Sequence, residues 1–183
     1  ISEQQPIVAH IPSKQVASSD PLRLMRVEAD RGTITFASGR TEARLGGNIE
    51  GIPYTVQAIY RGTTAQSPFE AVFSLGEFDL RRDSPILRFA TPLVLERLED
   101  FGHPVAKVKG QIVVSRTAGG DIEYRGEIRM REGVAAFHRF PYQFQDLRAL
   151  VSFTRDEVVI HRVEGGAPNG ATIVAEGRIS PPN

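Results

Sequence analysis

The sequence predicts an all-β protein with one short helix, whose antiparallel strands form a curled or sandwich-like sheet with an apolar concave face. Three observations predict this fold class. Apolar and polar residues alternate with a period of two along most of the 183 residues, as in strands that bury one face. Turn residues separate the alternating runs, and the linkers are too short for parallel crossovers, which need about a dozen residues each.

Nine runs carry this alternation, and each is expected to form one strand. The most regular run, DIEYRGEIRMR at 121–131, places apolar or small residues at even positions and charged residues at odd positions. Most runs end at turn sequences such as Arg61-Gly62, Gly119-Gly120 and Pro168-Asn169-Gly170, where the chain can reverse. The predicted strands span residues 32–38, 41–51, 54–60, 69–80, 105–116, 121–131, 147–154, 157–164 and 171–179.

One segment, TPLVLERLEDFGHP at 91–104, breaks the period of two. Thr91 is suited to cap a helix, and Pro92 to occupy its first position. Apolar residues then recur at helical spacing, Gly102 stands where a helix would end, and Pro104 stops further winding. We expect a helix over residues 92–101 that covers one end of the sheet.

The chain is expected to contain one main domain. Residues 1–21 are polar with scattered Pro and Ser and are expected to be a linker or to hold an edge strand. Residues 22–183 are expected to form a single β-rich domain. Two stacked strand groups, residues 22–90 and 105–181, joined by the helix, remain an open alternative within it.

Two further features concern the ends of elements. The segment FHRFPYQF at 137–144 holds four aromatic residues around Pro141. We expect a corner or strand crossover there, because proline interrupts a strand ladder. The chain begins at Ile1 rather than at methionine, and we expect it to be part of a longer protein.

Composition excludes several functions. Lys and Arg together number 22, as do Asp and Glu, so the net charge is zero, and the local basic clusters have acids beside them. The sequence therefore predicts no binding of nucleic acid. The absence of cysteine excludes disulfides, thiolate metal sites and cysteine nucleophiles. No run approaches the ~20 apolar residues of a membrane-spanning helix.

No arrangement of residues that performs catalysis is found. The four histidines form neither an HxH nor an HExxH pattern, there is no GxSxG turn, and the glycine-rich stretches lack the lysine and helix of a phosphate-binding loop. Glu123 and Glu127 lie on one face of one strand with Arg125 between them, which suits a solvated face better than an acid–base pair. The sequence predicts a non-enzymatic protein with no catalytic residues, no metal ligands and no cofactor.

The remaining candidate is the apolar side of the strands. In a sandwich these side chains would fill a core, whereas in an open curled sheet they would line an apolar groove, and alternation fits both. The candidate groove-lining residues are Ile122, Tyr124, Ile128, Met130, Val151 and Phe153.

Several motifs in the last 90 residues form a pattern. A short apolar helix and a glycine-containing strand, LVLERLEDFGHPVAKVKGQIVV, precede Gly126-Glu127-Ile128 and then DLRALVSF at 146–153. Val158 and Ile160 follow after a charged turn, and Ile173 leads into Gly177-Arg178-Ile179. This order resembles the C-terminal type of repeat in bacterial AsmA-like or TamB-like proteins.

The resemblance implies a function that the residues alone do not. It implies a periplasmic β domain of an inner-membrane-anchored protein of the cell envelope, involved in outer-membrane biogenesis or lipid transport. Phospholipid acyl chains, other segments of the same protein or other envelope proteins would be its partners. The family has no catalytic residues to transfer. The alternative is a β-sandwich interaction or carbohydrate-binding module with a filled core.

Overall fold

A computed structural model of the protein describes residues 27–89, 92–137 and 142–180. The segment 1–21, the residues Thr91 and Pro141, and most of the aromatic segment's tip lie outside the described residues. The expected linker, helix cap and proline corner are therefore not described further.

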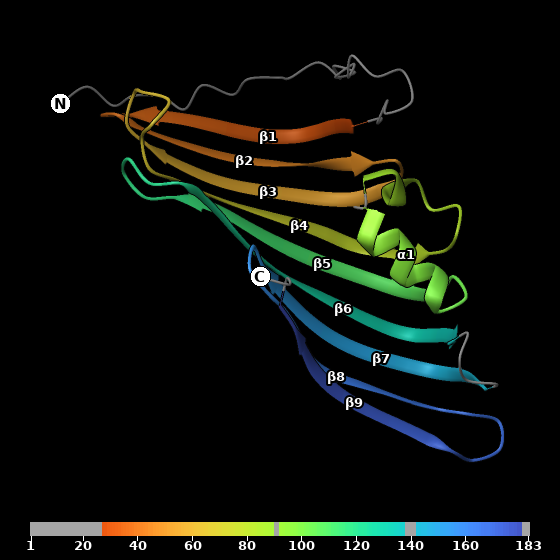
Figure 1. Ribbon diagram of the computed structural model, residues 1–183. Helices are drawn as coiled ribbons and strands as arrows, with labels where there is room; N and C mark the ends of the chain where they lie inside the picture. The colour runs from red at the N-terminus through yellow and green to blue at the C-terminus, as the bar shows by residue number, and fades with distance from the viewer. Residues whose placement is uncertain (1–26, 90–91, 138–141, 181–183) are drawn as a thin grey trace. The chain divides into compact units, whose positions relative to one another are not determined.

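Nine antiparallel strands form one sheet in which the strand order follows the sequence from β1 to β9 (Figure 1). The all-β fold with one short helix is thus confirmed. The strands are β1 Val27–Ala37, β2 Arg40–Ile49, β3 Ile52–Arg61, β4 Phe69–Leu80, β5 Val105–Arg116, β6 Ile122–Ala136, β7 Gln143–Thr154, β8 Val158–Gly166 and β9 Thr172–Ile179.

The chain divides into two compact units that share strands β4, β5 and β6. Among the described residues, the first unit holds those up to Gly76 together with Gln111–Gly126, and the second holds those from Glu77 to Gly110 and from Glu127 onward. The first unit therefore contains β1–β3 and the second contains β7–β9. Each unit is described separately below.

Two of the hairpins have the tightest possible connection. Ser38 and Gly39 join β1 to β2 with φ angles of 45° and 76°, and Glu50 and Gly51 join β2 to β3 with φ angles of 50° and 83°. Two successive residues with positive φ define the turn whose twist matches the twist of paired strands. Glycine adopts this conformation freely, which explains why it follows the polar residue in both turns.

Bulges account for the main differences between predicted and observed strands. The observed β6 continues to Ala136, whereas alternation predicts an end at residue 131. Glu132 has a φ of 53°, and beyond it the buried residues are the odd-numbered Gly133 and Ala135 rather than even-numbered ones. Asp146, with a φ of 52°, similarly marks a register shift near the start of β7. At such a residue the apolar positions change from even to odd numbers, or from odd to even. A prediction based on strict alternation therefore ends the strand at this residue, although the strand continues beyond it.

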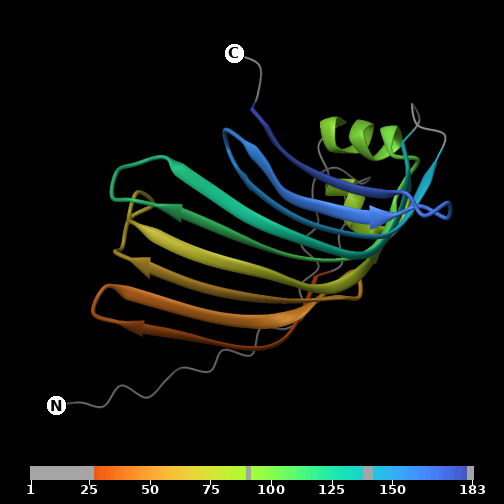
Figure 2. The same ribbon diagram turned by 90° about the horizontal axis from the view of Figure 1, so that it is seen from below.

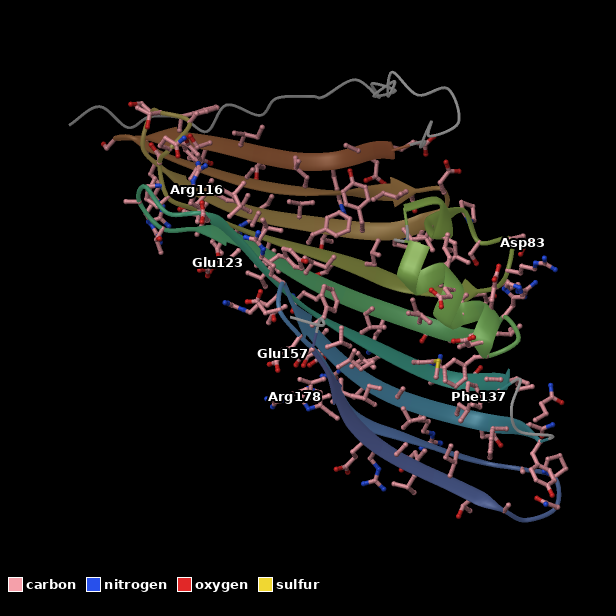
Figure 3. All side chains as sticks on the ribbon, viewed as in Figure 1. Asp83, Arg116, Glu123, Phe137, Glu157 and Arg178 are labelled. Atoms are coloured by element: carbon pink, nitrogen blue, oxygen red, sulfur yellow. The ribbon has the colours of Figure 1, made fainter. Side chains whose placement is uncertain are left out.

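The expected helix is present as α1, Pro92–Asp100, after a short 3₁₀ turn at Pro85–Phe89. It ends as the sequence predicts, because Gly102 has a φ of 64° and the N–H of His103 donates to the carbonyl of Leu98 at 2.9 Å. Figure 2 shows α1 on one side of the strands of the second unit. Its C-terminal end meets the end of β6, where the ring of Phe101 lies 5.1 Å from that of Phe137. Phe137 is labelled in Figure 3.

Leu147 of β7 is the largest of the buried apolar residues described in the second unit, and it is 6% exposed. Glycines of the neighbouring strands make room for it. A Cβ atom at Gly133 would lie 2.8 Å from the Cβ of Leu147, and one at Gly165 would lie 2.6 Å from its Cδ2. Ala106, Val108 and Ala135 are the other buried apolar residues of this unit, and Ile49, Ile52 and Tyr54 those of the first, among the described residues.

A substitution at Gly47 can test the close approach of β1 and β2. A Cβ at Gly47 would overlap the carbonyl oxygen of Glu28 and lie 2.9 Å from the Cα of Ala29, so the backbone of β1 would have to move. We expect Gly47→Ala to lower the free energy of unfolding by about 1–3 kcal/mol, measured by urea denaturation. Gly177→Ala is the matched control, because nothing lies within 4 Å of its Cβ position. An equal effect of the two substitutions would contradict the packing described.

Candidate functional site

Strand register gathers apolar side chains on one face of the first unit. Directly opposed residues of antiparallel strands point to the same side of the sheet. One row therefore runs from Leu45 through Val56 to Phe73 across β2, β3 and β4. The adjacent rows add Ile34, Ala43, Ala58 and Ala71 on one side, and Gly47, Tyr54 and Leu75 on the other.

The opposite face of the same strands is mainly polar. One row there joins Thr33, Arg44 and Gln57 and ends at Val72, and another joins Thr55 and Ser74. Arg40 and Glu42 form an ion pair at 2.7 Å on this side. The two faces of the first unit therefore differ in chemistry, as the alternation predicts.

Tyr54 is the most enclosed aromatic residue of the apolar face. Its ring stacks on that of Phe73 at 5.7 Å, and its side chain is 7% exposed. Burial raises the pKa of the Tyr54 hydroxyl, with a further contribution from the negative charge of Asp30. Both effects favour the neutral phenol.

The second unit has an apolar face of its own across β7, β8 and β9. One row joins Ala149, Val163 and Ala175, a second joins Val151, Ile160 and Gly177, and a third joins Phe153, Val158 and Ile179. A register shift between Ile160 and Val163 keeps these rows aligned. Without that bulge, Arg162 would fall among the apolar residues.

Many apolar side chains of the two faces are only partly enclosed. Within the described part of the chain, no side chain is less than 2% exposed, and Ile128, Ile179 and Phe36 are 39%, 56% and 59% exposed. A core between two packed sheets would enclose its large side chains fully. The apolar faces of the described residues are thus accessible surfaces.

The six candidate groove residues fall into separate groups. Ile122 and Tyr124 belong to the first unit and are 52% and 41% exposed. Ile128 and Met130 follow on alternate positions of β6 in the second unit. Val151 and Phe153 are half-buried in β7 and face the same side as Ile160 and Val158.

Sequence reasoning missed part of the apolar surface. Ile34, Phe36, Tyr54 and Val56 stand at alternate positions in β1 and β3 and share the face described above. Their alternation is visible in the sequence. Their common face depends on the strand register, which alternation alone does not define.

The polar face of the second unit carries a shallow depression of about 440 Å³. Its charged lining consists of six basic residues and two acidic ones, supplied by β4–β8. The lining residues are Glu77, Lys107, Lys109, Arg129, Met130, Arg131, Arg148, Ala149, Leu150, Arg162 and Glu164.

A bidentate ion pair is the strongest contact in this depression. The Nε and Nη2 atoms of Arg131 donate to the two carboxylate oxygens of Glu77 at 2.6 and 2.8 Å, and Arg131 also pairs with Glu132. The hydrogen bonds from Arg131 hold the pKa of the Glu77 carboxyl below its ordinary value, against a smaller opposing effect of desolvation. The same contact raises the pKa of Arg131.

The hydroxyl of Ser152 and Nε2 of His161 are 2.7 Å apart, which is the geometry of a nucleophile and its base. Both residues lie on an open strand face. No carboxylate among the described residues contacts His161, so the third group that orients the base in a hydrolase is not found there. The described residues also contain no group of three or more His, Cys, Asp or Glu that could hold a metal ion.

The Glu77–Arg131 pair predicts a pH-dependent contribution to stability. The folded-state pKa of Glu77 lies below the pKa of 4.5 that the residue has when unfolded. The pair therefore contributes fully to the free energy of unfolding above pH 4.5, and this contribution is lost as the pH falls through the folded-state pKa. We expect Arg131→Gln to raise the pKa of Glu77, measured by ¹³C-carboxyl NMR. Arg129→Gln is the control, because Arg129 pairs with Glu127 instead. A Glu77 pKa that is the same in the Arg131 variant and the native protein would show that the pair does not form.

Comparison of the chain with family models, curated proteins and solved structures yields no match. None of the described helices is both long and apolar enough to cross a membrane. The functional interpretation therefore depends on the geometry of the two faces.

Proposed function

We propose that this chain is a non-enzymatic β domain of an AsmA-like protein of the bacterial cell envelope. In this proposal it lies in the periplasm as part of an inner-membrane-anchored protein, and its apolar face binds phospholipid acyl chains during outer-membrane biogenesis or lipid transport. The resemblance of residues 110–181 to that family suggested the role. The long antiparallel strands in sequence order are compatible with it.

One observation carries the proposal: rows of apolar side chains that cross adjacent strands remain partly exposed. In the first unit, the row from Leu45 to Phe73 crosses three strands, and neighbouring strands are about 4.8 Å apart. Contiguous exposed apolar surface of this kind is typical of sites that bind another apolar group.

An acyl chain is a suitable occupant for physical reasons. It needs a continuous apolar surface and no directed hydrogen bonds, and the faces offer aliphatic and aromatic side chains. Burial of each methylene group contributes about 0.8 kcal/mol. A short stretch of acyl chain on one unit would therefore bind measurably.

The second hypothesis, a β-sandwich interaction or carbohydrate-binding module with a filled core, has less support. The described residues pair in one sheet, and their large apolar side chains are not fully enclosed. Such a module would be lipid-free and would lose its fold when a charge entered the core.

The first test maps where a lipid lies. We expect a phospholipid with a photoreactive group in its acyl chain to crosslink to residues such as Phe36, Val56 and Val151 on the apolar faces. Polar-face neighbours such as Thr35 and Gln57 should be labelled much less. The sites would be identified by mass spectrometry after digestion. Equal labelling of both faces, or none above that of a soluble photoreactive control, would reject the proposal.

The second test separates binding from folding. Ile128 is 39% exposed, so an aspartate there stays in contact with water, and Ile128→Asp should leave the thermal unfolding midpoint nearly unchanged. The charge should still weaken acyl-chain binding about tenfold, because the chain would have to desolvate it. Binding would be measured by titration with a fluorescent fatty acid.

Val174→Asp is the matched control for this test. Val174 is also an exposed aliphatic residue of the second unit, at 64%, but it pairs with Glu164 on the polar face. The control should bind the fatty acid as the native protein does. Unfolding of the Ile128 variant would favour the filled-core module instead.

A further inference from the structure

The depression on the polar face of the second unit is lined by more basic than acidic side chains. Six Lys and Arg side chains line it against two glutamates. Other acids that pair with these cations, such as Asp79, Glu127 and Glu132, are not part of the lining. The charge that a ligand would meet inside the depression is therefore positive, although the protein has no net charge.

Four of the six cations have acidic partners. Arg131 is held by Glu77 at 2.6 Å, and Arg129 pairs with Glu127 at 2.7 Å. Arg162 pairs with Glu164 at 2.8 Å, and Lys107 lies 3.7 Å from Asp79. These contacts fix the positions of the paired side chains and reduce their net attraction for an anion.

The remaining two cations are Lys109 of β5 and Arg148 of β7. Within the described residues, neither has a carboxylate within 4 Å. Lys109 acts on Glu77 only through the longer-range field that lowers the pKa of that carboxyl. Arg148 is directly opposite Glu164 in the strand register, but Glu164 forms its ion pair with Arg162.

We propose that this depression binds a phosphate-bearing anion, a phosphate monoester or diester, with Lys109 and Arg148 as its principal ligands. A phosphate offers several acceptor oxygens at once, so it can contact cations from different strands. Arginine binds such a group through two parallel hydrogen bonds, and lysine through a compact charge. The depression's volume of about 440 Å³ is within the usual range of small-molecule sites.

The charged ligands of the site lie on the face opposite the proposed acyl-chain surface, although Met130 and Ala149 of the apolar positions also contribute to the lining. Its charged residues lie on the polar face, since Arg129 and Arg131 alternate along β6 with Ile128 and Met130. On β7 and β8, the polar rows Arg148–Glu164 and Leu150–Arg162 alternate with the apolar row Ala149–Val163. Failure of either proposal would leave the other standing.

The bulge in β8 is what brings Arg162 and Glu164 to this site. Strand alternation without the shift would place Ile160, Arg162 and Glu164 on one face. The register shift between Ile160 and Val163 moves the two charged residues to the polar side. The depression is therefore a product of the same irregularity that keeps the apolar rows continuous.

The phosphate could come from a free ligand or from a lipid headgroup, and the experiment has an arm for each. The protein would be titrated with glycerol 1-phosphate, a phosphate monoester, followed by NMR shifts of backbone amides. It would also be sedimented with phosphatidylcholine vesicles that contain or lack phosphatidylglycerol. Saturable glycerol phosphate shifts in β5–β8 would identify a soluble phosphate ligand, and cosedimentation only with the anionic vesicles would identify a headgroup.

Charge-removing variants test the ligands. Lys109 and Arg148 are exposed, so Lys109→Gln and Arg148→Gln should not disturb the fold. Each should weaken binding severalfold, and the double variant should weaken it at least about tenfold. Arg178→Gln is the control, because Arg178 pairs with Glu157 at 3.3 Å outside the depression (Figure 3).

Two results would overturn the proposal. The first is no saturable binding in either arm at low ionic strength, where exposed charges are least screened. The second is an equal loss of affinity in the Arg178 control and in each of the two single variants, since each of these three variants removes one positive charge. That equality would mean that the protein responds to total charge and not to this site.

Discussion

Adjacent strands of this protein must keep their apolar residues on the same side of the sheet, and the rest of the structure depends on this constraint. Because the side-chain period in a strand is two, a single-residue error in pairing would move a whole set of apolar side chains to the other face. The chain maintains the alignment through tight two-residue turns at Ser38-Gly39 and Glu50-Gly51. Where the sequence itself breaks the alternation, it uses bulges. The shift after Ala29 in β1 and the shift after Ile160 in β8 each return the following apolar residues to the common face.

The bounds of some elements could be predicted closely from the sequence. β4 and β5 begin and end where the alternation predicts, at Phe69–Leu80 and Val105–Arg116, and α1 ends just before the glycine that the sequence marks as its stop. The predictions were less accurate at Glu132 and Asp146, which have positive φ angles. No local signal distinguishes these acidic residues from other surface acids of the strands. At Asp146 the irregularity coincides with a shift in the pairing of β7 with β8, and strand pairing is a non-local property.

The candidate site shows the same division between local and non-local information. The apolar character of Ile128, Val151 and Phe153 follows from alternation, and so does the polar character of Arg129. The shared rows that join Val151 to Ile160 and Leu45 to Phe73 require the register. The basic depression was missed for this reason. Its cations come from four strands, and the sequence near Arg129 and Arg131 shows only an alternation of signs.

The two faces contribute differently to stability. The exposed ion pairs of the polar face add little, since solvent and salt screen them. Folding must therefore be supported by the strand ladders and by apolar contacts within each unit, such as those of Leu147 and Tyr54. The partly exposed apolar rows leave some of the available hydrophobic stabilisation unused. A ligand that covers these rows only in the folded state would stabilise that state by linkage, by about 2.7 kcal/mol at a hundred times its dissociation constant. The stability of a sheet with an open apolar face thus depends on whether a ligand covers that face. The stability of a protein with a fully buried core would not depend on a ligand in this way.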